Sequence, residues 1–268
     1  MTKRLRIFAG PNGSGKSSVI QKIINTEVQK GVKLDFGIYV NADDIAKELS
    51  KKSCSFTKYQ INFIAEEFYE IVYDSGLINN EFTAERFKQC VCIEKNKIFV
   101  NKENAKCFDD KPYERIAQII ADYLRKKLLK EEKKFSFETV FSHKGKVDII
   151  KKAKSAGYKV YLYFVSTEHP RINVYRVKVV RVGEKGHDVD EEKIISRYYR
   201  SMDLMFEAAQ YCYQTYFFDN SIEGSEQTMF AHFKLNSDGE KLWDKLDEKK
   251  YPEWFKKYYS AKINNFIS

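Results

Sequence analysis

Residues 10–17 read Gly-Pro-Asn-Gly-Ser-Gly-Lys-Ser, the complete Walker A pattern. Its glycines let backbone N–H groups turn toward a phosphate, and the start of a following helix favours negative charge. The lysine at this spacing reaches the terminal phosphates of a nucleotide, and the serine hydroxyl ligates magnesium. The pattern therefore predicts a phosphate-binding loop with ATP and Mg2+ as cofactors. The residues assigned to ATP are Gly10, Pro11, Asn12, Gly13, Ser14, Gly15, Lys16, Ser17 and Ser18, with Ser17 also assigned to Mg2+.

Carboxylates follow two of the predicted strands. Asp43 and Asp44 come just after residues 36–40, where a carboxylate can accept the proton of an attacking hydroxyl group. The alternative is that they cap the next helix. Glu138 and Thr139 end another strand, where the acid can organise magnesium with its waters, contact a substrate hydroxyl, or belong to a structural network. These positions are candidates for proton transfer and substrate binding.

Arginines gather around a glycine- and histidine-containing loop at residues 183–187. Mobile arginines of this kind can close over a nucleotide and stabilise charge on a transferring phosphoryl group. The alternative is that most of them lie on solvated helix faces, and His187 is expected to shape the loop by hydrogen bonding rather than to catalyse. The arginines are Arg171, Arg176, Arg181, Arg197 and Arg200.

Alternating strands and amphipathic helices must position these groups. Apolar segments at residues 5–9, 36–40, 135–137, 158–165 and 215–218 predict five strands, and the segments between them have helical periodicity. This alternation predicts an α/β protein with a doubly wound, mainly parallel five-stranded sheet, the P-loop NTPase fold. Ligands of such sheets lie at the carboxyl ends of the strands. Asn220 follows the last of the five strands, where it borders a nucleotide base or, as we favour, forms a turn.

We expect residues 1–268 to form one kinase-like domain with a helical insertion at 51–111 and an extension at 225–268. The extension starts with an alternating strand at 229–235 and continues with short helices rich in Trp and Tyr.

Composition narrows the protein class. The chain is 43% hydrophobic and 32% charged, as expected of a globular domain. We find no signal peptide and no apolar run long enough to span a membrane, so a cytoplasmic protein with free thiols at its five cysteines is expected. The net charge of +9 favours anionic partners and is compatible with nucleic acid.

Four motifs, in order, resemble the zeta toxin family of P-loop kinases: GPNGSGKSS, VNADDIA, FSFETVFS and RVGEKGHDVDEEKIISRYYRS. The resemblance covers residues 4–220 and is interrupted by 51–111, which is similar to an insertion in a longer subgroup. The chain departs from the family at Lys185, where a glycine is common, and the insertion and the tail after Gly224 are absent from compact members. These departures bear on the identity of the substrate.

The resemblance implies transfer of phosphate from ATP to the 3′-hydroxyl of the amino sugar in UDP-N-acetylglucosamine, and a small helical antitoxin as partner. By motif, Lys16 and Ser17 hold ATP and magnesium, and Asp43 is the catalytic base. Glu138 and Thr139 bind the substrate. The arginines that contact phosphate match Arg181 and Arg197.

Three functions remain open from the sequence. The first is a kinase that acts on a nucleotide sugar, as the motifs imply. The second is a kinase that acts on nucleic-acid ends, which the basic charge and the shared P-loop chemistry allow. The third is a nucleotide-binding switch without catalytic activity that binds a protein partner.

Overall fold

The computed structural model describes residues 2–106, 112–181, 189–244 and 247–263, which form two compact units. Unit 1 comprises residues 1–36 and 136–268, and unit 2 comprises residues 37–135. Unit 2 contains the whole segment 51–111. The description of the chain as one domain with an insertion stays a prediction.

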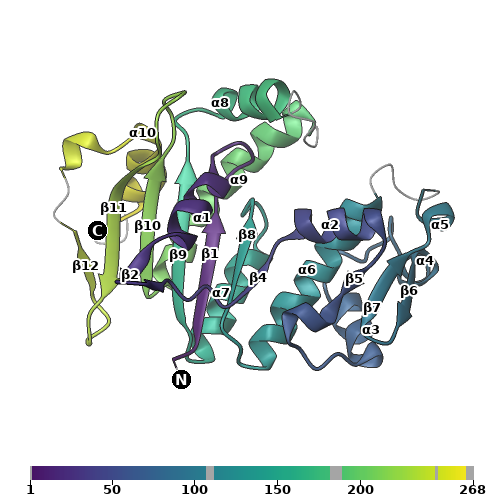
Figure 1. Ribbon diagram of the computed structural model, residues 1–268. Helices are drawn as coiled ribbons and strands as arrows, with labels where there is room; N and C mark the ends of the chain where they lie inside the picture. Colours follow the sequence, from purple (N-terminus) through teal and green to yellow (C-terminus); the bar gives the residue numbers. More distant parts are fainter. Residues whose placement is uncertain (1, 107–111, 182–188, 245–246, 264–268) are drawn as a thin grey trace. The chain divides into compact units, whose positions relative to one another are not determined.

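Unit 1 is built on a mixed sheet (Figure 1). Its described strands run in the order β12-β11-β10-β9-β1-β8. β1 pairs in parallel with β9, and β9 with β10, whereas β10, β11 and β12 pair antiparallel. Their bounds are β1 Arg4–Ala9, β8 Phe135–Thr139, β9 Lys159–Ser166, β10 Gln214–Asp219, β11 Thr228–Leu235 and β12 Lys241–Trp243. The mostly parallel α/β fold is confirmed. β11 matches the strand predicted at residues 229–235, whereas the short helix expected around Leu242 is wrong, because residues 241–243 pair with β11 as strand β12.

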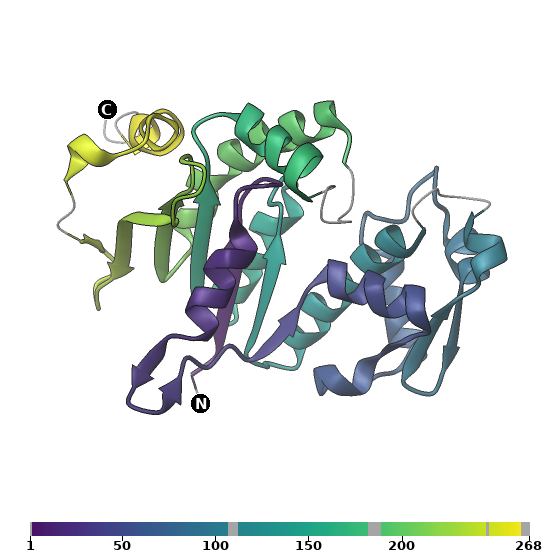
Figure 2. The same ribbon diagram turned by 45° about the horizontal axis from the view of Figure 1, so that its top comes forward.

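Helices cover both faces of this sheet. The two ribbon views place α1 on one face and α7 and α9 on the opposite face (Figures 1 and 2). β2 and β3 form a short hairpin after α1. The bounds are α1 Lys16–Ile24, β2 Glu27–Gln29, β3 Val32–Lys33, α7 Gly145–Ser155, α8 Pro170–Tyr175, the π-helical η2 Arg176–Arg181, and α9 Glu191–Gln210. The C-terminal segment adds η3 Glu248–Lys250, α10 Glu253–Phe255 and the π-helical η4 Lys256–Ser260.

An aromatic cluster packs the C-terminal extension against the rest of unit 1. The Phe217 ring lies 4.9 Å from Phe255 and 5.0 Å from Tyr259, measured between ring centroids. Tyr259 also contacts Phe206 of α9 at 5.3 Å. All four side chains are buried or nearly so, and large aromatic rings contribute most of the apolar area of such a core. The extension is therefore part of the hydrophobic core.

Unit 2 has a separate core. Its three-stranded sheet runs in the order β5-β7-β6, and β6 and β7 form an antiparallel hairpin. The fully buried rings of Phe56, Phe68, Phe87 and Tyr123 fill its interior. The bounds are β4 Ile38–Val40, α2 Ala42–Lys51, β5 Cys54–Ser55, η1 Phe56–Tyr59, α3 Ala65–Tyr73, α4 Ala84–Cys90, β6 Val91–Glu94, β7 Lys97–Val100, α5 Lys102–Lys106 and α6 Pro112–Lys130.

Two further sequence predictions concern membrane-spanning segments and the cysteines. Within the described ranges, no helix is both long and apolar enough to cross a bilayer. Cys54, Cys90, Cys92 and Cys212 are free thiols, as expected, and Cys107 lies outside the described residues.

A nearly buried ion pair joins α3 to α6 in unit 2. Glu67 accepts hydrogen bonds from Lys127 and, at 2.7 Å, from Lys130. Lys127 also lies 3.2 Å from Glu131, and its side chain is only 5% exposed. Hydrogen bonds from Lys127 and then Lys130 lower the pKa of Glu67 despite partial burial. Because the folded-state pKa is lowered, the pair stabilises the fold above the ordinary pKa of a carboxyl and loses this contribution as the pH falls.

We predict that Glu67→Gln lowers the free energy of unfolding by about 1–3 kcal/mol at neutral pH, because Lys127 stays buried with one acceptor fewer. The difference from the parent protein should shrink as the pH falls below about 4. Urea unfolding of the full chain at several pH values measures it. Glu70→Gln on the exposed face of the same helix is the control, with a change within about 0.5 kcal/mol. A Glu67→Gln deficit that stays constant down to low pH would contradict the ion-pair explanation.

Candidate active site

The loop between β1 and α1 has a backbone shape that depends on glycine. Gly10, Gly13 and Gly15 have φ values of 144°, 71° and 90°, a region that other residues rarely adopt. A Cβ atom on Gly10 would lie 2.0 Å from the carbonyl oxygen of Val165, and one on Gly15 would lie 2.2 Å from Nδ2 of Asn220. The loop thus runs against β9 and the end of β10 without room for side chains, which explains the glycine spacing in the sequence.

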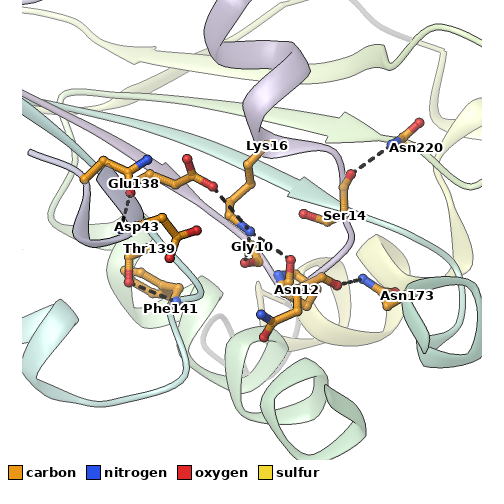
Figure 3. Close-up of polar contacts among 12 residues, drawn as sticks. Gly10, Asn12, Ser14, Lys16, Asp43, Glu138, Thr139, Phe141, Asn173 and Asn220 are labelled. Carbon is orange, nitrogen blue, oxygen red and sulfur yellow. Dashed lines mark hydrogen bonds and ion pairs between the residues drawn. The ribbon is translucent and has the colours of Figure 1, made fainter. Parts of the chain in front are cut away.

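Lys16 lies inside the loop that precedes it. It begins α1 and is only 7% exposed. Its ammonium group donates to the carbonyl oxygens of Gly10 at 3.0 Å and Pro11 at 2.9 Å, and lies 4.0 Å from Oε1 of Glu138 (Figure 3). The structure therefore brings together Lys16 and Glu138, which are far apart in the sequence.

Two asparagines hold the outer side of the loop. Asn173 of α8, which is fully buried, donates from Nδ2 to the Asn12 carbonyl at 2.5 Å. Asn220, just after β10, donates from Nδ2 to the Ser14 carbonyl at 2.9 Å (Figure 3). Sequence analysis did not identify Asn173, and it favoured a turn role for Asn220. No local signal marks either residue, because the partners are backbone atoms of a distant loop.

The donor groups of the loop fit a nucleotide phosphate. Oγ of Ser14 is buried and has no hydrogen-bond partner among the described residues, so its hydroxyl can donate to a phosphate oxygen. The hydroxyl-bearing Ser17 and Ser18 are exposed in the first turn of α1, next to the helix N-terminus, which favours anions. Together with the glycine-lined backbone and Lys16, these groups match the donors that triphosphate recognition requires. Assignment of residues 10–18 to ATP stays a prediction.

Magnesium fits the same site if phosphate supplies most of its ligands. The described ranges contain no group of three or more His, Cys, Asp or Glu side chains that could hold a metal ion. Mg2+ is commonly bound through a few protein oxygens together with substrate phosphates and water. The exposed Ser17 hydroxyl suits that mode.

The segment after β8 carries a backbone outlier beside the predicted substrate-binding pair. Phe141 is fully buried with φ of 61°, an uncommon conformation for a bulky residue. Its N–H donates to Oγ1 of Thr139 at 3.2 Å (Figure 3). Glu138 and Thr139 are both partly exposed. The chain turns sharply here, and this turn fixes the Thr139 hydroxyl next to Glu138.

Asp43 and Asp44 lie in unit 2, in the first turn of α2. Asn41, rather than either aspartate, caps this helix, and its Oδ1 accepts from the Asp43 N–H at 2.8 Å. Both aspartates are exposed. The capping alternative is therefore wrong for the N-cap position, and the carboxylates remain as first-turn acids. Their role in catalysis stays a prediction.

The predicted arginines fall into separate environments. Arg176 donates from Nε to Glu223 and from Nη1 to the Asn220 carbonyl, each at 2.8 Å, so it is part of the support around the loop. Arg197 of α9 is half-buried, and burial together with the charge of Arg200 lowers its pKa. Arg181 is the last residue of η2. Residues 182–188, with Lys185 and His187, lie outside the described residues.

Comparisons with known proteins identify the fold. No protein-family model and no curated protein matches the chain. A chain in the crystal structure of AvrRxo1-ORF1:-ORF2 with ATP is similar at a TM-score of 0.51 and 15% identity, covering 96% of this chain and 63% of that one. A chain of the PezAT toxin-antitoxin system of Streptococcus pneumoniae has a TM-score of 0.44 at 10% identity, covering 100% of this chain and 88% of that one.

The first of these likenesses shows the fold alone, and the second, with a TM-score below 0.5, adds nothing to that assignment. Because this chain spans only 63% of the length of the AvrRxo1 chain, the activity, substrates and partners of that protein are proposals here. The mostly parallel α/β architecture is shared with a chain of the AvrRxo1-ORF1:-ORF2 complex, whose structure was solved with ATP.

We predict that Gly10→Ala destabilises the protein by about 1–3 kcal/mol more than Gly157→Ala does, because the backbone of β9 must move to admit the methyl group. Gly157 is the matched control, since it also has positive φ, at 78°, but a Cβ there would meet nothing within 4 Å. Equilibrium urea unfolding of both variants checks this. Equal losses would show that the loop is not packed tightly against Val165.

Proposed function

We propose that the chain is an ATP-dependent kinase of the zeta toxin type that transfers the γ-phosphoryl group to a sugar hydroxyl of a nucleotide sugar such as UDP-N-acetylglucosamine. The observation that carries the proposal is the glycine-shaped loop with the buried Lys16 ammonium beside Glu138. Phosphoryl transfer depends mostly on positioning and on stabilising negative charge, and this arrangement supplies both.

In this proposal unit 1 holds the phosphates. When bound, ATP supplies the phosphoryl group, and Mg2+ neutralises charge on its phosphates. The backbone N–H groups of residues 10–17 and the N-terminus of α1 bind the phosphate oxygens. Lys16 neutralises the terminal phosphates, and Ser17 contributes its hydroxyl to the magnesium ion.

Glu138 and Thr139 are proposed to bind the acceptor. Glu138 lies close enough to Lys16 for its carboxylate to orient an acceptor hydroxyl near the terminal phosphate. Because Thr139 Oγ1 already accepts from the Phe141 N–H, its own hydrogen remains oriented for donation to a substrate oxygen. Both roles rest on the motif resemblance together with this local geometry.

Asp43 is proposed as the general base, and Arg181 and Arg197 as the cations that stabilise the transferring phosphoryl group. The exposed Asp43 carboxylate at the start of α2 is accessible to a substrate hydroxyl. The burial that lowers the pKa of Arg197 also strengthens its interaction with an anion, since a half-buried charge is less screened by water. A small helical antitoxin as a protein partner, and a cytoplasmic location, rest on the sequence alone.

A substrate panel tests the proposal. The protein is incubated with γ-labelled ATP and Mg2+ and with UDP-N-acetylglucosamine, other nucleotide sugars, or 5′-hydroxyl oligonucleotides. We expect label on UDP-N-acetylglucosamine or a related nucleotide sugar. Label on oligonucleotides alone would identify a nucleic-acid-end kinase. Binding of ATP with transfer to no member of the panel would favour the non-catalytic switch.

We predict that Lys16→Ala weakens ATP·Mg binding by roughly 10- to 100-fold, because it removes the charged donor aimed at the terminal phosphates. Titration calorimetry measures the affinity, and circular dichroism confirms that the variant is folded. Lys22→Ala is the control, because Lys22 lies on the same helix with its side chain 45% exposed. Parental affinity in Lys16→Ala would refute the proposed role of the loop.

We predict that Asp43→Asn slows phosphoryl transfer roughly 10²- to 10⁴-fold, the usual contribution of positioned proton transfer. ATP affinity and folding should survive, because the amide has nearly the same size and the Asn41 cap binds the backbone N–H of residue 43. Asp44→Asn, also in the first turn and exposed, is the matched control and should lose much less. Single-turnover rates with the best panel substrate decide it, and a parental rate in Asp43→Asn would exclude this residue as the base.

A further inference from the structure

The two loop carbonyls that the asparagines bind belong to peptide units whose N–H groups point away from the asparagines. A trans peptide is planar, so its C=O and N–H point in opposite directions. The hydrogen bond from Asn220 to the Ser14 carbonyl therefore fixes the direction of the Gly15 N–H. Asn173 does the same for the Gly13 N–H through the Asn12 carbonyl. Each asparagine therefore fixes the direction of one backbone N–H group of the loop.

Asn220 is fixed from three directions. Its N–H donates to the Ser166 carbonyl at 2.9 Å, at the end of β9. Its carbonyl accepts from Nη1 of Arg176 at 2.8 Å. Its side chain is packed so closely against Gly15 that a Cβ there would reach 2.2 Å from Nδ2. At 8% exposure, Asn220 has little freedom to reorient.

The C-terminal extension fixes both neighbours of Asn220. Trp254 of α10 donates from Nε1 to Oδ1 of Asp219 at 2.8 Å. The Ser221 hydroxyl donates to the same oxygen at 2.7 Å, and the Ser221 N–H donates to Oδ2 at 3.1 Å. Trp254 is 2% exposed, so it cannot leave this carboxylate without disturbing the core. The contacts run from Trp254 through Asp219 to Asn220 and the Ser14 carbonyl.

A second set of contacts joins the extension to β9. The Glu253 N–H donates to Oε1 of Glu168 at 2.8 Å, and the Glu168 N–H donates to the Ser221 hydroxyl at 2.8 Å. Thr167, the residue before Glu168, donates from Oγ1 to Asn173 Oδ1, and its carbonyl accepts from the Tyr198 hydroxyl at 2.7 Å. The segment after β9 that leads to Asn173 and the end of β10 that leads to Asn220 are thus tied to the extension as well as to α9.

We propose that Asn220 is a positioning residue for the nucleotide-binding loop and that the C-terminal extension holds it in place through Trp254 and Asp219. The effect on ATP affinity rests on the proposed function above, whereas the effect on the mobility of the loop does not. The extension then contributes to the nucleotide site through the support that it gives to Asn220.

Hydrogen exchange of the full chain tests the positioning role independently of nucleotide. Asn220→Asp keeps the size of the side chain but replaces the amide donor with an oxygen that the Ser14 carbonyl repels. We expect amides of residues 10–17 to exchange roughly 2- to 10-fold faster, as for loss of one buried hydrogen bond. Trp254→Phe keeps an aromatic ring but loses the donor to Asp219, and it should accelerate the same peptide to a smaller extent.

Tyr259→Phe is the matched control in the same extension. It removes a hydroxyl group from a buried ring whose oxygen lies 3.5 Å from Lys241, away from Asp219. A merely structural role of the extension predicts that this variant and Trp254→Phe affect exchange in residues 10–17 equally. The proposal predicts parental exchange there for Tyr259→Phe. Unchanged exchange of this peptide in both Asn220→Asp and Trp254→Phe would overturn the proposal.

Calorimetric titration of the same variants with ATP·Mg separates this proposal from the proposed function. We expect affinity to fall roughly 2- to 10-fold in Asn220→Asp, with no change in Tyr259→Phe. If the parent protein bound no ATP while Asn220→Asp still accelerated exchange in residues 10–17, positioning would stand and the kinase proposal would fail. Parental ATP affinity in Asn220→Asp, with a parent that does bind ATP, would overturn the positioning role.

Discussion

The close approach of Gly10 to the carbonyl oxygen of Val165 is the constraint on which the site depends. It forces the chain to leave β1 in a left-handed conformation and to turn next to β9 before α1 begins. Along this path Lys16 reaches back to the Gly10 and Pro11 carbonyls. The elements that hold the loop in that path are the end of β9, the end of β10 and helix α8.

This constraint explains why the loop was the most predictable part of the site. A residue with positive φ that lies tightly against its neighbours has to be glycine, and this accounts for the glycines at positions 10, 13 and 15. The strands that flank the loop were predictable for a similar reason. β9 is buried on both faces, which produces the nearly continuous apolar run at residues 160–165.

The supporting residues were not predictable, because their identity has no local cause. An asparagine after a strand is a common turn residue, and nothing near position 220 indicates that its amide reaches the carbonyl of Ser14. Asn173 lies within a short helix, where its sequence neighbours contain no sign of Asn12. The pairing of β11 with β10 was also missed, because an alternating strand shows one buried face but not which strand it pairs with.

The aromatic cluster of the extension also determines how a shortened chain would behave. Without β11, strand β10 would become an edge strand with unsatisfied backbone groups, and the Phe217 ring would lose its contacts with Phe255 and Tyr259. An open strand edge beside an uncovered apolar surface favours association between copies of a chain. Proteolytic trimming near Gly224 would therefore make the chain prone to aggregation. The extension thus limits self-association in addition to forming part of the core.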